Sequence, residues 1–176
     1  MPPHQAAFVR KLRDAGRLEA LFTQGLQLVF SGKAHPADAK GKEVVEELFA
    51  ASKRWPNNVV FVENYDMNWG AKLTRGVDLW LNNPRRPLEA SGTSGMKAAM
   101  NCVPQLSTLD GWWAEAYTPE VGWALGDGQE HGDDPSWDAA EAEALYTLLE
   151  GELIPEFYRR DRNGIPTAWV ARIRES

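Results

Sequence analysis

The chain has 176 residues, of which 43% are hydrophobic and 25% charged, and its formal net charge is −6 at pH 7. This is the composition of a globular protein, and the length fits one domain with a sizeable core. No apolar run is long enough to cross a membrane, and the segment after Met1 lacks the apolar stretch of a signal peptide. The single cysteine excludes a disulfide framework or a cysteine-based zinc site and favours a reducing, cytoplasmic location.

The charge is divided unevenly along the chain. Residues 1–88 have a net charge of +4 and residues 89–176 a net charge of −10. The acidic half would repel nucleic acid, and the basic half has no cluster of Lys and Arg interleaved with aromatic residues. Neither nucleic acid nor a membrane is therefore an expected partner. Eight Trp are unusual for this length and indicate either a large core or a flat ligand to stack on.

Helical and extended patterns alternate along the chain. Apolar residues at helical spacing predict helices, and short β-branched or apolar runs predict buried strands. In chain order, the patterns predict a helix over 5–23, a strand over 26–30, an N-cap at Asp38, a helix over 41–52, a strand over 59–62, an extended piece over 79–81, a helix over 94–101, a strand over 103–108, a two-part helix over 137–150 and 152–160, and a helix over 165–174. Strands separated by helices indicate an α/β fold with a parallel sheet, whose sites lie beyond the carboxyl ends of the strands.

The densest run of candidate residues lies between 87 and 101. Ser91, Thr93 and Ser94 would add hydroxyl donors to the exposed N–H groups of a helix N-terminus, where anions bind. Lys97 falls in or just after the first turn, where the helix dipole disfavours a cation, and this indicates a bound anion or a special role. The alternative is a serine-capped helix with a solvated Lys97. The segment matches neither the P-loop nor the dinucleotide-binding motif.

Other polar residues follow the predicted strands. Glu89 suits hydrogen bonds to sugar hydroxyls, although it could equally favour the helix dipole. Tyr65, at the end of the polar run 63–65, would face the same cleft or cap its strand. Lys33 and His35 follow the first strand, and a lone His at such a turn is more often structural than catalytic.

Two features lie near the last predicted strand. Trp112 and Trp113 would form part of the core or a stacking surface for a sugar ring. Cys102 has no obvious catalytic partner in the pattern and is expected to be a small buried residue.

The string Glu89-Ala90-Ser91-Gly92-Thr93-Ser94-Gly95-Met96-Lys97, followed by Asn101 and Leu109-Asp110-Gly111, resembles the pyridoxal-phosphate segment of the α-glucan (glycogen, starch and maltodextrin) phosphorylases. Ser94-Gly95 and the pair Trp112-Trp113 are similar to the shorter bacterial and archaeal branch of that family. The strings 31–36, 62–65, 82–87 and 122–128 support the resemblance and stand in the family's order. The resemblance runs from about Gln27 to the C-terminus.

This resemblance implies a Rossmann-like parallel sheet with flanking helices, the C-terminal half of a glycosyltransferase with two Rossmann-like domains (GT-B). Residues 1–25 would be a helical stretch at the truncated edge. Residues 26–135 would form the domain that binds cofactor and sugar, and residues 136–176 would be C-terminal helices that pack on it.

The family transfers a glucosyl unit from the non-reducing end of an α-1,4-glucan to inorganic phosphate and gives glucose 1-phosphate. The resemblance implies that Lys97 holds pyridoxal 5'-phosphate as a Schiff base, with the cofactor phosphate as proton donor or electrostatic partner. It places Thr93 and Ser94 near that phosphate and Tyr65 beside the cofactor. No metal is implied.

The substrate-binding residues implied by the resemblance lie mostly in the same run. Glu89, Ser91 and Gly92 match positions that hold the glucosyl unit, and Lys33 lies near the cleft. Lys97 and Glu89 are the expected catalytic residues.

The chain departs from the family pattern in two ways. Family members are several times longer, so this chain is expected to be a fragment that is inactive without the missing N-terminal domain, which is a candidate partner. The usual Asn-Gly of the family is Asn101-Cys102 here, and Cys would be strained if that position needs a positive φ.

Two alternatives remain open at this point. Glu89-Ala90 and Asn101-Cys102-Val103-Pro104 also fit the looser pattern of nucleotide-sugar glycosyltransferases, so the chain could be a remnant of such an enzyme. The second alternative is a non-catalytic module that binds sugar or a partner, or a truncated gene product with no activity. An exposed former domain interface would then make the chain associate with itself or with other proteins.

Overall fold

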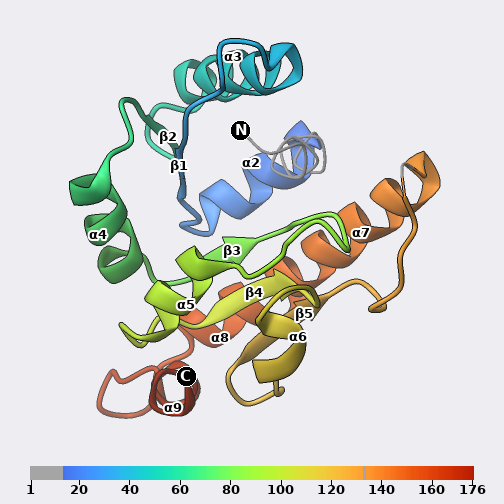
Figure 1. The fold of residues 1–176 in the computed structure, drawn as a ribbon. Coiled ribbons are helices and arrows are strands. Elements are labelled where there is room, and N and C mark those ends of the chain that lie inside the picture. Colours follow the sequence, from blue (N-terminus) through green and yellow to red (C-terminus); the bar gives the residue numbers. More distant parts are fainter. Residues whose placement is uncertain (1–13, 133) are drawn as a thin grey trace. The chain divides into compact units, whose positions relative to one another are not determined.

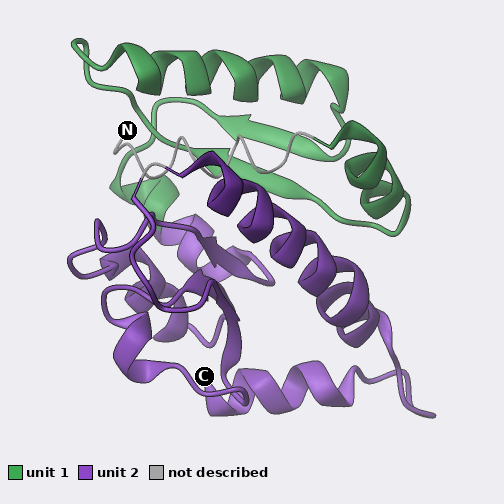
Figure 2. Cartoon of the chain, turned by 90° about the vertical axis from the view of Figure 1, so that its right-hand side faces the viewer, with its two compact units in different colours: residues 1–70 green, residues 71–176 purple. Residues whose placement is uncertain are grey.

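The computed structural model describes residues 14–132 and 134–176, and the chain divides into two compact units, Met1–Gly70 and Ala71–Ser176 (Figures 1 and 2). Each unit is described by itself. The first part of the helix predicted over 5–23, with Phe8 and Leu12, lies outside the described residues. Among the described residues, no helix has both the length and the hydropathy needed to cross a membrane.

The first unit contains a two-stranded parallel sheet with a long helix on one face. Its elements are α2 (Ala15–Thr23), β1 (Leu28–Ser31), α3 (Ala39–Arg54) and β2 (Val59–Val62). β1 pairs with β2 in parallel, from Leu28 opposite Val59 to Ser31 opposite Val62. Val44 and Leu48 of α3 are buried and pack against Phe30 and Phe61 of the two strands.

The start of α3 follows the sequence prediction. Asp38 is the N-cap, and its carboxylate accepts a hydrogen bond of 2.8 Å from the backbone N–H of Gly41. This bond satisfies one of the N–H groups that a helix leaves unpaired at its start. A Cβ at position 41 would lie 2.3 Å from Asp38 Oδ2, so a larger residue there would require the carboxylate to shift.

The second unit contains a three-stranded parallel sheet in the order β3-β4-β5, formed by Trp80–Asn82, Gln105–Thr108 and Gly122–Leu125. All four residues of the middle strand β4 are buried. Its helices are α5 (Thr93–Ala99), α6 (Trp113–Ala116), α7 (Pro135–Leu148), the π-helix η1 (Leu149–Leu153), α8 (Ile154–Tyr158) and α9 (Thr167–Glu175). α4 (Met67–Gly76) spans the boundary between the units.

The C-terminal helix is held to the rest of the second unit by one arginine and by the buried Trp169, which packs on Trp123 and Phe157. Arg172 of α9 forms two hydrogen bonds with the Glu156 carboxylate, of 2.6 and 3.1 Å, and its guanidinium lies 4.0 Å from the ring centre of Trp123. Trp123 Nε1 in turn donates to Glu152 Oε2 over 3.1 Å. Arg172 therefore connects α9, α8 and β5 through a charged pair that is largely shielded from water.

Most of the predicted elements are confirmed, with small shifts in their ends. The strand predicted over 59–62 is β2 with identical bounds, and Gly151 lies in the π-helix at the predicted interruption. Three elements went unpredicted: α4, α6 and β5. The parallel α/β class is confirmed as two small sheets with flanking helices, while the domain limits 26–135 and 136–176 stay predictions.

Most of the tryptophans are buried or partly buried, although Trp69 is exposed. Trp113, Trp123 and Trp169 are buried, and Trp80 and Trp112 are partly buried.

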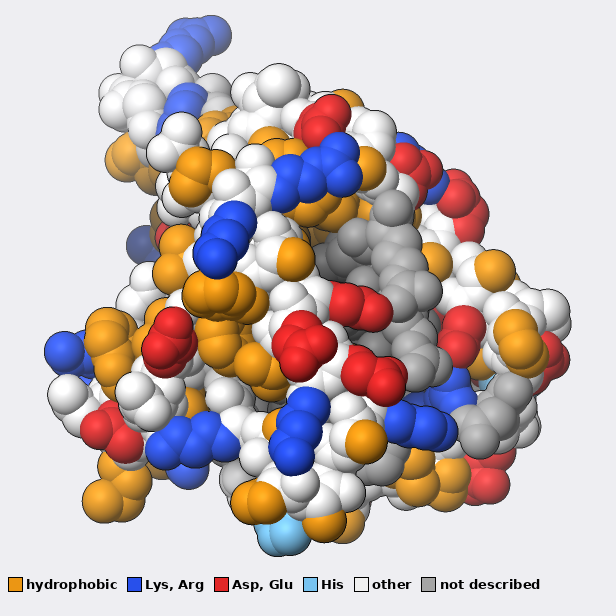
Figure 3. All heavy atoms as spheres, turned by 90° about the horizontal axis from the view of Figure 1, so that it is seen from above, with side chains coloured by type: hydrophobic (Ala, Val, Ile, Leu, Met, Phe, Trp, Pro, Cys, Tyr) orange, Lys and Arg blue, Asp and Glu red, His pale blue; other side chains and the backbone are white. Residues whose placement is uncertain are grey.

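On the face seen in Figure 3, basic and acidic side chains are mixed with apolar ones.

Candidate functional site

The candidate residues of the second unit lie on the loop that connects β3 to α5 and on α5 itself. Gly92 is the N-cap of α5 and has a φ of +85°, a left-handed conformation that favours glycine. Since glycine has no side chain, no side-chain hydrogen bond caps the helix. The backbone N–H groups of the first turn are therefore directed beyond the helix without a capping side chain, beside the exposed Ser91, Thr93 and Ser94.

The segment that follows β4 supports this loop. The buried carboxylate of Asp110 accepts hydrogen bonds from the backbone N–H groups of Glu89, over 2.9 Å, and Gly111, over 3.0 Å. The N–H of Trp112 donates to the carbonyl oxygen of Ser91 over 2.9 Å. A guanidinium N–H of Arg86 also donates to the carbonyl of Leu109. The loop is thus attached to the end of the middle strand at several points.

Two glycines of the loop are needed because of close packing. A Cβ at Gly92 would lie 2.9 Å from Cδ1 of Trp112. A Cβ at Gly95 would lie 2.6 Å from Gln105 Oε1 and 3.0 Å from Trp112 Nε1. Gln105 Nε2 donates to the carbonyl of Gly95 over 3.1 Å, while its Oε1 is buried without a hydrogen-bond partner. The first turn of α5 is therefore held between an indole and a buried amide.

Lys97 lies in the last turn of α5 and is exposed. The helix has only seven residues, so, contrary to the sequence prediction, Lys97 is not at a position where the helix dipole disfavours a cation. A cation in a last turn is favoured by the dipole. The Nδ2 group of Asn101 donates to the carbonyl of Lys97 over 2.7 Å and closes the end of the helix.

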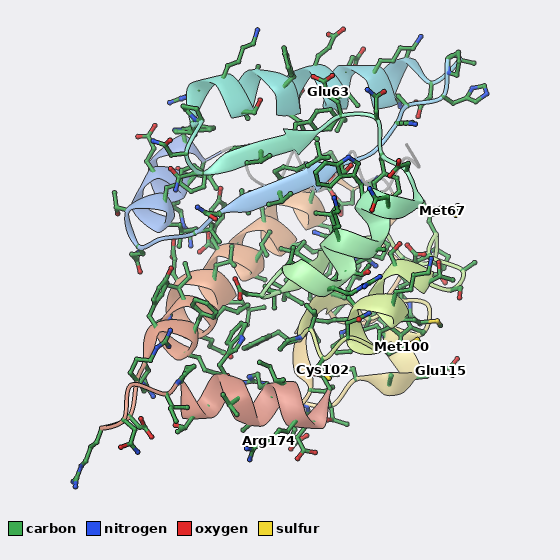
Figure 4. All side chains as sticks on the ribbon, turned by 90° about the vertical axis from the view of Figure 1, so that its left-hand side faces the viewer. Glu63, Met67, Met100, Cys102, Glu115 and Arg174 are labelled. Atoms are coloured by element: carbon green, nitrogen blue, oxygen red, sulfur yellow. The ribbon has the colours of Figure 1, made fainter. Side chains whose placement is uncertain are left out.

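Cys102 contradicts its predicted burial. Its side chain is exposed (Figure 4), and its φ of +60° is in the left-handed region. The strain foreseen for a cysteine in place of the family's glycine is therefore present. The turn is closed by a hydrogen bond of 2.8 Å from the N–H of Cys102 to the carbonyl of Ala99.

Lys33 and Tyr65 belong to the first unit. Lys33 is exposed and follows β1, and Tyr65 is half-buried and follows β2. A Cβ at Gly70 would lie 2.7 Å from the Tyr65 hydroxyl, so the ring packs closely on the first turns of α4. His35 has a structural role, since its Nδ1 accepts the N–H of Ala37 over 3.2 Å.

A small pocket lies elsewhere in the second unit, beyond the carboxyl ends of β4 and β5. It is partly open to solvent, and Arg86, His131 and Trp137 are among its lining residues. The His131 ring stacks on Trp137 with centroids 3.6 Å apart and its Nε2 lies 3.0 Å from the Asp127 carboxylate. Neither Lys97 nor Glu89 lines this pocket.

Asp110 and Gln105, which had no predicted role, contact the loop and the first turn of α5. For Asp110, the available signal was an acidic residue before a glycine at the end of an apolar strand. For Gln105, it was an amide within a run that is otherwise suited to a buried strand.

Comparison with known proteins agrees with the motifs of this loop. Residues 11–122 match the carbohydrate phosphorylase family. The chain is 48% identical over 168 residues to a glycogen phosphorylase of Aquifex aeolicus, 45% identical over 170 residues to a glycogen phosphorylase of Mycobacterium bovis, and 41% identical over 170 residues to a maltodextrin phosphorylase of Thermococcus litoralis. These alignments cover 93%, 94% and 94% of this chain.

The chain therefore belongs to the carbohydrate phosphorylase family. The family match begins at residue 11, so the start expected near Gln27 was too late. The chain spans only 24%, 20% and 20% of the length of these three relatives.

Proposed function

We propose that this chain is the cofactor-bearing part of an α-glucan phosphorylase, which transfers a glucosyl unit from the non-reducing end of an α-1,4-glucan to phosphate and gives glucose 1-phosphate. The observation that carries the proposal is the complete run from Glu89 to Lys97, held in a defined conformation in a chain up to 48% identical to glycogen phosphorylases. Since the chain spans about a fifth of such enzymes, the activity is proposed for the assembly with the remaining part.

The residues of the loop fit pyridoxal 5'-phosphate. The N–H groups of the first turn of α5, with Thr93 and Ser94 beside them, suit a phosphate group. Lys97 is exposed, so its amine is accessible to an aldehyde. Gly92 is needed for this conformation of the loop, because a side chain there would collide with Trp112 and displace the loop.

The residues of this chain would divide the work as follows. Lys97 holds the cofactor, Thr93 and Ser94 bind its phosphate, and Glu89, Ser91 and Gly92 hydrogen-bond the glucosyl unit. When bound, the cofactor supplies a phosphate that acts as proton donor or electrostatic partner for the substrate phosphate.

Two further contacts are proposed from the first unit on the family resemblance alone. Tyr65 would contact the cofactor, and Lys33 would contact the substrate. Lys33 is exposed, and an ammonium group suits contact with a phosphate or a sugar hydroxyl.

The test is covalent labelling. The chain is incubated with pyridoxal 5'-phosphate, reduced with borohydride, digested and mapped by mass spectrometry. We expect a pyridoxyl adduct on Lys97 that Lys97→Arg abolishes, because a guanidinium does not condense with the aldehyde. Lys53→Arg is the matched control, since Lys53 is also exposed in the last turn of a helix. An adduct spread evenly over the surface lysines would contradict the proposal.

The same experiment addresses the alternative of a nucleotide-sugar transferase. Such an enzyme has no need for a reactive lysine at position 97. Saturable binding of a nucleoside diphosphate sugar together with no Lys97 adduct would favour that alternative.

A further inference from the structure

Glu89 and Ser91 lie on a loop outside any helix or strand, although a sugar site requires fixed donors and acceptors. A loop of this kind is mobile unless its backbone is held. A side chain that lies just beyond the end of the middle strand hydrogen-bonds the backbone of this loop. This side chain is Asp110, whose two carboxylate oxygens each accept one backbone N–H.

The position of Asp110 in the fold suits it to hold the backbone of the loop that carries Glu89 and Ser91. It follows β4, the middle strand of the sheet, which is buried along its whole length. Gly111 brings the two segments together, because a Cβ there would lie 2.8 Å from the carbonyl oxygen of Ser91 and 3.0 Å from that of Glu89. The Trp112 N–H then donates to Ser91. The contact is therefore close and partly buried, and it begins directly after a buried strand.

We propose that Asp110 is a positioning residue of the sugar and cofactor site, an inference that rests on the proposed function. Its carboxylate holds the backbone of Glu89, and thereby sets where the Glu89 side chain begins and how the loop enters α5. Two acceptor oxygens are required, because one binds Glu89 and the other binds Gly111. Asp110 itself need not touch substrate or cofactor.

The substitution Asp110→Asn tests this requirement with a side chain of the same shape. An amide offers one acceptor oxygen, and its NH₂ group faces the second backbone N–H without a hydrogen bond. The matched control is Asp134→Asn in the same unit. Asp134 also accepts a backbone N–H, that of Ser136 over 2.8 Å, but at the start of α7.

The first measurement is hydrogen exchange of the backbone N–H groups of Glu89 and Gly111 in the full chain without cofactor. Because the amide keeps one acceptor oxygen, we expect Asp110→Asn to raise the exchange of one of these two N–H groups about tenfold, which corresponds to one lost hydrogen bond, and Asp134→Asn to leave both unchanged. Unchanged exchange in Asp110→Asn would overturn the proposal. If that variant does not fold by circular dichroism, Asp110→Ser, which keeps one acceptor oxygen without the NH₂ group, replaces it.

The second measurement separates positioning from general stability. Labelling of Lys97 is titrated with pyridoxal 5'-phosphate, in conditions where urea titration shows each variant fully folded. We expect Asp110→Asn to need about ten times more cofactor for half-labelling, and Asp134→Asn to match the wild type. Equal labelling of Lys97 in wild type and Asp110→Asn would overturn the proposal. A wild-type chain with no selective label at Lys97 would instead overturn the proposed function.

Discussion

β4, at the centre of the three-stranded sheet, is buried along its whole length, whereas β1 and β2 leave Val29 and Val60 exposed at 43% and 45%. These two valines are partners in the register, and they point away from the face that carries Phe30 and Phe61. The two-stranded sheet therefore has a helix on one face and an apolar pair on the other.

The difference shows how each sheet can support a site. A middle strand is hydrogen-bonded on both sides, and the loop after β4 is correspondingly tied to the loop that carries Glu89. A two-stranded sheet is marginally stable in isolation and gives less support to the segments that follow it. We therefore expect the second unit to hold Lys97 and Glu89 more firmly than the first unit holds Lys33 and Tyr65.

The largest effect should come from the buried strand. Leu106→Ala in β4 removes a side chain with no exposed surface and should lower the free energy of unfolding by about 2–5 kcal/mol. Val60→Ala in β2 should cost about 0.5 kcal/mol or less, because Val60 is 45% exposed. Urea titration followed by circular dichroism measures both. If Val60→Ala lowers the free energy of unfolding as much as Leu106→Ala does, the two sheets do not differ in burial as described. That result would show that Val60 is covered in solution.

Ion pairs should give an intermediate effect. Arg172→Gln breaks a pair in which both side chains are only 18% exposed, and we expect a loss of about 2 kcal/mol. Arg54→Gln in the first unit breaks an ion pair with Glu19 in which the side chains are 58% and 53% exposed, so we expect about 0–1 kcal/mol. Thermal unfolding at low and high salt checks both, and salt should reduce the Arg54 effect more. Equal decreases in the free energy of unfolding for Arg172→Gln and Arg54→Gln would contradict the distinction between the two units.

We expect the smallest change in the free energy of unfolding from the helix caps Asp38 and Asp134. The change should be the same in both units, because each cap depends on local hydrogen bonds. The N–H of Gly41 holds the pKa of Asp38 below its ordinary value of 3.8, and the hydroxyl of Ser136 does the same for the pKa of Asp134. A carboxyl whose pKa is lower in the folded state stabilises the fold above its unfolded pKa, and this stabilisation is lost as pH falls through the folded pKa.

We therefore expect Asp38→Ala and Asp134→Ala to destabilise the chain at neutral pH, and both deficits to shrink as the pH falls below the ordinary value of 3.8. Urea titrations of each variant and of wild type across this pH range measure the deficit. A deficit that is independent of pH would show that the charge of the cap contributes nothing. A deficit that shrinks in one variant only would show that the caps, too, differ between the units.

Local signals in the sequence predicted local structure well. The β-branched run of β2 and the cap of α3 at Asp38 were both readable, because each depends on neighbours within a few residues. α4 was missed although Asp66 caps it, with its carboxylate 2.8 Å from the N–H of Trp69, because Gly70 and Gly76 weaken the helical pattern. β5 was missed because it begins at Gly122, and glycine is uncommon in strands. The tertiary structure requires this glycine, since a Cβ at position 122 would lie 2.3 Å from the carbonyl oxygen of Gln105.

The sequence by itself determined the alternation of helices and strands and the motif from Glu89 to Lys97, because both depend only on residues that are close together in the chain. Tertiary structure decided that the strands form two sheets, that α5 ends early enough to put Lys97 in its last turn, and that Cys102 is exposed at a positive φ. It also decided that Asp110, 21 residues from Glu89, holds the backbone of the loop. The physical reason is that hydrogen bonds and packing between distant segments are selected by the whole fold, and no local pattern records them.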